Sequence, residues 1–200
     1  MKMLKVLIAS AALFTTTASF AADRPVHLRG EITAVSATEL TVTDRKGVKT
    51  TVKLPEQMQV VDVSRSSIDD IKENSYLGVA AAPAPEGKVR AMGVMVFPEQ
   101  ARGLNEGHFP WDMGDRSTMT NATVAKVTRK ASATELEMRF GGKTQQVVLD
   151  KATVYGSFVP GKRELIVAGV KAVVVAMPTA DGGYNANFVM VGRDGFLPPI

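Results

Sequence analysis

The chain has 200 residues, of which 45% are hydrophobic, and it contains no cysteine. The lack of cysteine excludes disulfide bonds, thiol-attached haem and a lipidated N-terminal cysteine. The formal net charge is only +4, so the composition predicts no concentrated basic surface for nucleic acid.

Residues 1–21 have the three parts of a cleaved secretory signal peptide. A positive start, MKMLK, precedes the apolar run VLIASAALF, and small residues at Ser19 and Ala21 suit signal peptidase. The alternatives are cleavage after Ala22 and an uncleaved membrane anchor, but the apolar run is shorter than the roughly 20 residues that span a bilayer. Cleavage after Ala21 leaves 179 residues. We therefore expect a periplasmic protein whose mature chain has no transmembrane segment.

From Leu28 to Phe97 the sequence has the pattern of short strands. Segments rich in Val, Thr and Ile alternate with turn residues such as Arg-Lys-Gly and Pro-Glu-Gln. The predicted strands are GEITAV (30–35), ELTVTD (39–44), VKTTVKL (48–54), MQVVDV (58–63), YLGVAAA (76–82) and VRAMGVMVF (89–97). One helical turn is expected between 64 and 75, capped by Ser66 or Ser67, with Ile68 and Ile71 facing inward.

The second half of the chain repeats this order. SATEL occurs at 36–40 and again at 132–136, and MGVMV (92–96) matches NFVMV (187–191) at nearly the same spacing. Matches in register over about 70 residues indicate an internal duplication rather than a catalytic signature. Glu39 and Glu135 are then expected in equivalent hairpins, far apart, and not as a catalytic pair.

These patterns predict an all-β fold. The preferred architecture is two tandem OB-like small β-barrel repeats, residues 22–98 and residues 121–200 with the C-terminal tail, joined by a structured linker at 99–120. The alternative is one fused β-sandwich in which the repeats exchange strands, because duplicated small barrels can hide their edges by sharing them.

Three stretches carry a resemblance to a known family. RGEITAV near the start, EGHFPWD in the linker and VMVGRDGFLPPI at the end resemble uncharacterised proteobacterial exported proteins with an OB-like domain of unknown function. Members of that family often carry the name metal ABC transporter permease. A permease needs several long apolar helices, and this sequence predicts none. The resemblance therefore implies a compartment and an architecture rather than a chemistry.

The linker holds the candidate binding residues. It contains one of two histidines and the single tryptophan, and it has no counterpart in the other repeat. Phe109 and Trp111 are the expected anchors, His108 a polar contact, Asp112 a turn residue or ligand, and Arg116 an interface cation. The alternative is structural: Phe109 and Trp111 wedge between the barrels while Arg116 pairs with Asp112 or with Asp115.

Two rival interpretations use the same histidine. A metal site would combine His108 with Asp112 or Asp115, with thioether ligands from Met113 and Met119. No second histidine lies near in sequence, since His27 is at the start of the mature chain. A hydrolase would need His108 as the base and one of the same aspartates to orient it, but the sequence has no Gly-x-Ser-x-Gly elbow.

The sequence thus predicts a non-enzymatic binding or accessory module for a protein or small-molecule partner. It has no Gly-rich phosphate loop, and we expect no cofactor. Nucleic acid is not an expected partner, because few aromatic residues lie among Lys and Arg in the strands. The apolar tail GRDGFLPPI (192–200) is expected either to dock on a neighbour or to cover the chain's own barrel.

Overall fold

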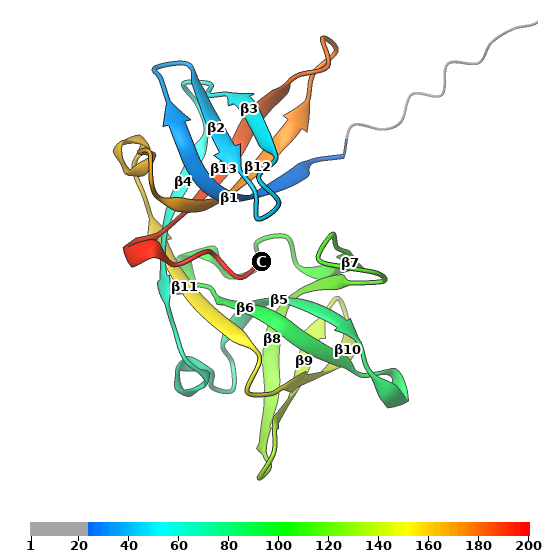
Figure 1. The fold of residues 1–200 in the computed structure, drawn as a ribbon. Helices are drawn as coiled ribbons and strands as arrows, with labels where there is room; N and C mark the ends of the chain where they lie inside the picture. Colours follow the sequence, from blue (N-terminus) through cyan, green and yellow to red (C-terminus); the bar gives the residue numbers. More distant parts are fainter. Residues whose placement is uncertain (1–23) are drawn as a thin grey trace, which may run out of the picture.

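The structure, a computed structural model, describes residues 24–200 (Figure 1). The predicted signal peptide, 1–21, lies outside the described residues. The strands are β1 (Val26–Val35), β2 (Glu39–Thr43), β3 (Lys49–Lys53), β4 (Gln59–Arg65), β5 (Tyr76–Pro83), β6 (Val89–Val96), β7 (Gly107–Pro110), β8 (Thr118–Arg129), β9 (Thr134–Phe140), β10 (Lys143–Leu149), β11 (Val154–Pro160), β12 (Lys171–Pro178) and β13 (Tyr184–Gly192). The all-β prediction is confirmed, as are the six strands expected before Pro98.

The helices of residues 24–200 are short 3-10 turns. They are η1 (Ile68–Asp70), η2 (Pro85–Gly87), η3 (Glu99–Ala101), η4 (Arg163–Leu165) and η5 (Arg193–Gly195). The turn predicted at 64–75 is confirmed: Ser67 caps η1 in a reciprocal capping box with Asp70, and Ile71 is buried. Within this part of the chain, none of the helices has the length and apolar character needed to cross a bilayer.

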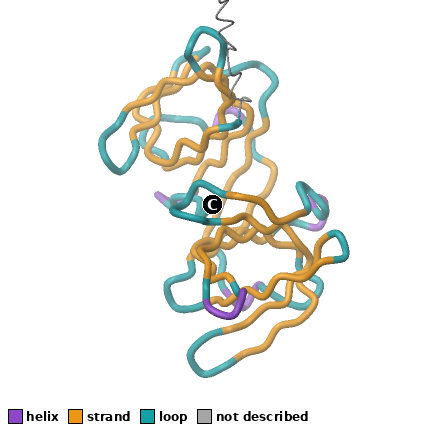
Figure 2. The backbone as a smooth tube through the Cα atoms, turned by 90° about the vertical axis from the view of Figure 1, so that its right-hand side faces the viewer, coloured by secondary structure: helices purple, strands orange, loops and turns teal. Residues whose placement is uncertain are grey.

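The strands form one sheet whose two ends each curl into a ring. The order is β10-β9-β8-β5-β6-β11-β4-β13-β12-β1-β2-β3, and the extra pairings β10–β6 and β13–β3 close its ends. The upper ring, as drawn in Figure 1, holds β1, β2, β3, β12 and β13, and the lower ring holds β5, β6, β8, β9 and β10. Figure 2 shows the same two groups from the side. Strands from each half of the chain therefore lie in both rings.

The two rings have matching registers. The β5–β6 hairpin has a bulge after Ala80 opposite Gly93, and the β12–β13 hairpin has one after Val175 opposite Phe188. Each pair of equivalent residues is 95 positions apart, which is also the spacing of MGVMV and NFVMV. A second bulge also recurs, after Ile32 where β1 pairs with β2 and after Val124 where β8 pairs with β9, and these two residues are 92 positions apart.

Three apolar clusters hold this arrangement together. The lower core fills the lower ring around Leu77 and Leu136, and the upper core fills the upper ring around Ile32 and Val189. The third cluster, here called the seam core, lies between the rings and consists of Val61, Val63, Met95, Val173, Met190 and Phe196. Because each ring has its own interior, the seam core is the apolar contact through which the rings meet.

The C-terminal tail is part of the seam. Phe196, Pro198 and Pro199 are buried, and Figure 1 shows the chain ending between the two rings. The tail fits because glycines lie beneath it: a β-carbon on Gly93 would come within 1.7 Å of the Pro199 carbonyl oxygen, and one on Gly192 within 1.6 Å of the Phe196 carbonyl oxygen. Of the two expectations for the tail, the structure shows the one in which it covers its own chain.

This close approach gives a first prediction. Gly93→Ala places a methyl group against the backbone of the tail, so the tail must move or the strand must shift. We expect the free energy of unfolding to fall by about 1–3 kcal/mol, measured by urea denaturation. Gly47→Asn is the matched control, because Gly47 has open space around it and a positive φ that asparagine accepts. Equal stability of Gly93→Ala and the wild type would contradict the packing described for the tail.

Candidate functional site

The unusual linker forms a hairpin with the start of β8. Strand β7 pairs antiparallel with β8, with His108 opposite Thr120 and Phe109 opposite Met119. Ser117 closes the loop that follows: its backbone oxygen accepts from the Trp111 amide at 2.8 Å, and its hydroxyl donates to the Trp111 carbonyl at 2.8 Å. The loop that carries Trp111 and Asp112 is thus fixed by hydrogen bonds at its base.

The hairpin is anchored on the lower ring. The Tyr76 hydroxyl donates to the Leu104 carbonyl at 3.0 Å, and Arg102 bonds the Glu99 carboxylate and the Asn74 carbonyl. Burial, with a smaller contribution from the negative charge of Glu106, raises the pKa of Tyr76 to about 12. Tyr76 therefore keeps its proton, and its hydrogen bond, at neutral pH.

The alternation of β7 separates the predicted site residues. His108 faces β9, where its ring stacks on Phe140 with centroids 6.0 Å apart, and its Nδ1 lies 2.8 Å from the Thr120 hydroxyl. Burial lowers the pKa of His108, which favours the neutral ring. Phe109 and Trp111 face the other side of the hairpin, and the centroids of their rings are 6.2 Å apart. The structure does not bring His108 together with Trp111 and Asp112.

Asp112 instead joins the hairpin to the upper ring. Arg29 of β1 binds the Asp112 carboxylate in a bidentate manner: Nη2 donates to Oδ1 at 2.7 Å, and Nη1 donates to Oδ2 at 3.1 Å. His27, two residues before Arg29, lies 2.9 Å from Oδ2 through Nδ1, and its ring packs on Trp111 with centroids 4.2 Å apart. We call Asp112, His27 and Arg29 the latch.

The latch is charge-assisted. Burial by itself would raise the pKa of Asp112, but the hydrogen bonds from His27 and Arg29 outweigh it and hold the pKa below its ordinary value of 3.8. The carboxylate is therefore ionised at neutral pH, so Nδ1 of His27 carries the hydrogen that it donates. Bidentate pairs of guanidinium and carboxylate are among the stronger hydrogen-bonded contacts in proteins, and here one holds two distant parts of the chain in contact.

Asp115 and Arg116 lie outside this cluster. They form an ion pair with each other, with Arg116 Nε 3.5 Å from Asp115 Oδ2, and the side chains of Asp115 and Arg116 are 92% and 79% exposed. Of the two predicted partners for Arg116, the structure selects Asp115. Among residues 24–200, no three His, Asp or Glu side chains gather in a way that could hold a metal ion. The proposed ligands His108, Asp112 and Asp115 are thus dispersed, and Asp112 is engaged by Arg29.

A cleft of about 1250 Å³ lies between the rings, beside the latch. Its walls are the faces of the two strand groups that point away from their own cores. On the upper side, four residues on neighbouring strands form one row across the sheet. His27 of β1 lies opposite Val175 of β12, Val175 opposite Phe188 of β13, and Phe188 opposite Gln59 of β4. On the lower side, Met95 of β6 and Met119 and Asn121 of β8 line the cleft.

The cleft has an apolar floor and a polar rim. The apolar lining includes Met95, Phe97, Met119, Phe158, Phe188 and Met190, with Phe109 and Trp111 on the side of the hairpin. The rim carries the carboxamides Gln57, Gln59, Asn105 and Asn187. An apolar hollow with a few polar groups at its edge is the usual form of a ligand site. Of the predicted site residues, Phe109, Trp111 and Asp112 line this cleft.

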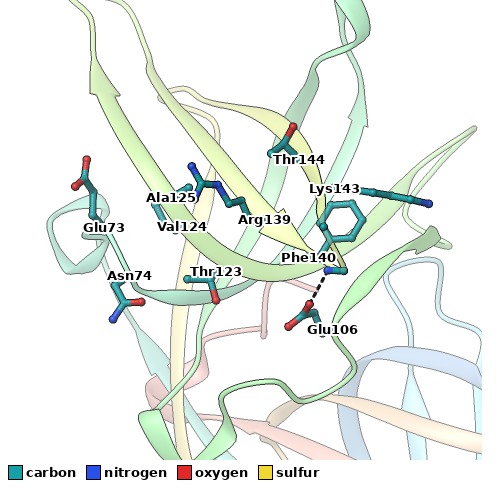
Figure 3. Close-up of a pocket in the computed structure, with 12 residues that line it drawn as sticks. Glu73, Asn74, Glu106, Thr123, Val124, Ala125, Arg139, Phe140, Lys143 and Thr144 are labelled. Atoms are coloured by element: carbon teal, nitrogen blue, oxygen red, sulfur yellow. Dashed lines mark hydrogen bonds between the residues drawn. The ribbon is translucent and has the colours of Figure 1, made fainter.

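A second hollow, of about 650 Å³, lies on the outer edge of the lower ring (Figure 3). Glu106 reaches across it and accepts a hydrogen bond from the Gly141 amide at 2.8 Å. Glu73, Arg139 and Lys143 give it charges of both signs. It contains none of the predicted site residues, and its polar character makes it the weaker candidate.

His27 and Arg29 are the site residues that sequence reasoning missed. They are separated from Asp112 by 85 and 83 positions, so no local motif joins them. One signal was present: a strand that places two basic side chains on the same face, at i and i+2, needs a carboxylate if that face is covered.

No protein-family model, no curated protein sequence and no solved structure matches this chain.

The latch gives a second prediction. Asp112→Asn keeps the shape of the side chain and removes its charge. Because 46% of the Asp112 side chain is exposed to screening solvent, we expect a loss of only about 1 kcal/mol in the free energy of unfolding at pH 7. The emission of Trp111 should shift to longer wavelength, because its loop is released from His27 and Arg29.

This loss should depend on pH in one direction. The pKa of Asp112 is lower in the native state than its ordinary 3.8, so its contribution is complete above pH 4 and declines as the pH falls further. Urea denaturation at pH 7, 4 and 3 should show the free energy of unfolding of the wild type approaching that of Asp112→Asn as Asp112 becomes protonated. Asp115→Asn is the control and should match the wild type throughout. A constant difference between wild type and Asp112→Asn would contradict the ionised latch.

Proposed function

We propose that this protein is a periplasmic, non-enzymatic binding or accessory module, and that a protein or small-molecule partner occupies the cleft between the rings. The observation that carries the proposal is the cleft itself: an apolar floor under a polar rim, walled by Phe109 and Trp111. The predicted signal peptide, 1–21, supports the compartment. No cofactor and no nucleic acid enter the proposal.

We propose further that the rings are two OB-like repeats that have exchanged strands. The sequence matches and the two recurring bulges, one of them at a spacing of 95, support this origin. In such an arrangement β5 and β6 of the first repeat complete the ring of the second, and β12 and β13 complete the ring of the first. The cleft then lies where the two repeats face each other, which is a common place for ligand sites.

The surroundings of His108 favour binding over hydrolysis. Its neighbouring hydroxyl, that of Thr120, belongs to a fully buried residue, so a substrate has no path to it. Among the described residues no carboxylate bonds to His108, whereas a catalytic base of this kind needs a group that orients it. Asp112, the residue predicted for that task, is bonded to His27 and Arg29 instead.

A fluorescence experiment tests the cleft as a binding site. Anilinonaphthalene sulfonate, a general probe for apolar sites, should bind the folded protein saturably and accept energy from Trp111, which lines the cleft. Phe109→Ser should weaken this binding at least fivefold, since it removes part of the wall. Phe140→Ser, which changes the second hollow, is the matched control and should bind as the wild type does. Equal effects of both variants, or no saturable binding, would overturn the proposal.

A titration with metals distinguishes the proposed function from the rival metal-handling function that centres on His108. Zn(II) and Cu(I) are added while the emission of Trp111 is recorded in the wild type and in His108→Ala. We expect no saturating change at one equivalent in either protein, because His108 lies on the opposite side of β7 from Trp111 and bonds Thr120. Quenching that saturates at one equivalent in the wild type and disappears in His108→Ala would establish the metal-handling function instead.

A further inference from the structure

Part of the space between the rings is already filled by a peptide, the chain's own tail. Phe196 is 3% exposed, and its backbone angles, φ −71° and ψ 129°, lie near the polyproline II conformation. Two prolines follow after Leu197, and their rings extend this conformation. Ile200 lines the cleft, and its carbonyl oxygen accepts a hydrogen bond from Arg29 Nε at 3.3 Å. The seam thus holds an extended, proline-containing segment whose last described residue borders the open cleft.

The open part of the cleft continues with similar surroundings. Its apolar lining is formed by aromatic rings and by the methionines Met58, Met95, Met119 and Met190. Methionine side chains are flexible and adapt to apolar groups of different shapes. Grooves walled by aromatic rings are the usual receptors for proline-containing extended peptides. The lining therefore suits a continuation of the kind of segment that the seam already contains.

The rim supplies partners for a peptide backbone. Gln57, Gln59 and Asn187 are exposed at the edge of the cleft, and each carboxamide offers both a donor and an acceptor. A peptide backbone presents the same two groups at nearly every residue. An acyl chain would make no use of these carboxamides, which would stay bonded to water.

The charges of the cleft balance. Arg24 and Glu106 lie on the rim, and Asp112 is neutralised by Arg29, which donates to both of its oxygens. A polyanion would find no opposite patch here, which argues against nucleic acid.

We propose that the open cleft binds an extended, uncharged segment of a partner protein, rich in proline and large apolar side chains, next to the chain's own tail. This inference rests on the proposed binding function and names the class of its partner. Phe109 and Trp111 on one side and Phe188 on the other form the pocket for the apolar side chains. The rim carboxamides bind the backbone.

The probe is a fluorescein-labelled decapeptide with the sequence FLPPIFLPPI, measured by anisotropy against the full mature chain. We expect saturable binding that Phe109→Ser and Phe188→Asn each weaken at least fivefold. Phe140→Ser should leave it unchanged, because Phe140 lines the other hollow. A control peptide in which both leucines are lysines should bind at least tenfold more weakly, since the charged ammonium groups would have to leave water for an apolar floor.

A second measurement does not depend on the stability of the variants. The same peptide with benzoylphenylalanine in place of one Phe is irradiated on the wild-type protein, and the linked residue is identified by mass spectrometry. Cross-links should fall on cleft residues such as Met58 or Met119. Binding that ignores Phe109 and Phe188, with cross-links elsewhere, would overturn the inference.

Two further probes separate this inference from the function on which it rests. Laurate represents an acyl chain, and chitotetraose represents a glycan. If either binds in the cleft, with loss in Phe109→Ser, and the decapeptide does not, the peptide inference falls and the binding function stands. If anilinonaphthalene sulfonate and all three ligands fail to bind, both fall.

Discussion

The antiparallel pairing of β4 with β11 is the contact on which the rest of this structure depends. Five residue pairs join these strands, from Gly156 opposite Arg65 to Pro160 opposite Val61. After β4 the chain passes from the upper ring to the lower one, and after β11 it returns. Each strand also pairs in parallel with a strand of one ring, β4 with β13 and β11 with β6. The pair thus connects both rings into a single sheet and leaves neither of its members as an edge. At its middle, Val63 lies opposite Phe158, and these residues are 95 positions apart, as are the matching bulge positions Ala80 and Val175.

This crossing explains why a cleft exists. Two closed rings joined along one strand pair can touch only where their curved outer faces approach, and the seam core fills that region with Val61, Met95 and Met190. Farther from the β4–β11 pair the faces diverge. The tail fills one part of the resulting space because Gly93 and Gly156 leave room for it on the lower face. The hairpin from β7 crosses another part, and the latch fastens it to β1. The part that remains open is lined by segments that are themselves held by hydrogen bonds or packing, so the cleft is preorganised.

The strands themselves were predictable, but their partners were not. The alternation of Val and Thr with Ser, Gly and Pro turns is local, and it located the ends of the strands of the first half to within four residues. The choice of partner is decided by contacts between distant residues. Because β5–β6 and β12–β13 have similar patterns and the same bulge, either hairpin offers the same edge to β1 or to β8, and no local signal distinguishes the two closures.

The candidate site was predicted only in part, for the same reason. Phe109, Trp111 and Asp112 stood out by composition, whereas the partners of Asp112 are fixed only by the packing of the upper ring.

The position of the cleft links binding to the integrity of the whole chain. Its upper wall comes from β1, β4, β12 and β13 and its lower wall from β6 and β8, so each wall contains strands from both halves of the sequence. A ligand that contacts both walls binds only when the chain has crossed twice and both rings have closed. Its binding free energy is then added to the stability of the complete arrangement rather than to that of one ring, by RT ln(1 + [L]/Kd). A segment held between the rings would also oppose their separation along β4 and β11, where five residue pairs and the seam core are otherwise the main restraint. The tail already acts in this manner from within the chain, and the partner proposed for the open cleft would stabilise the arrangement by the same means.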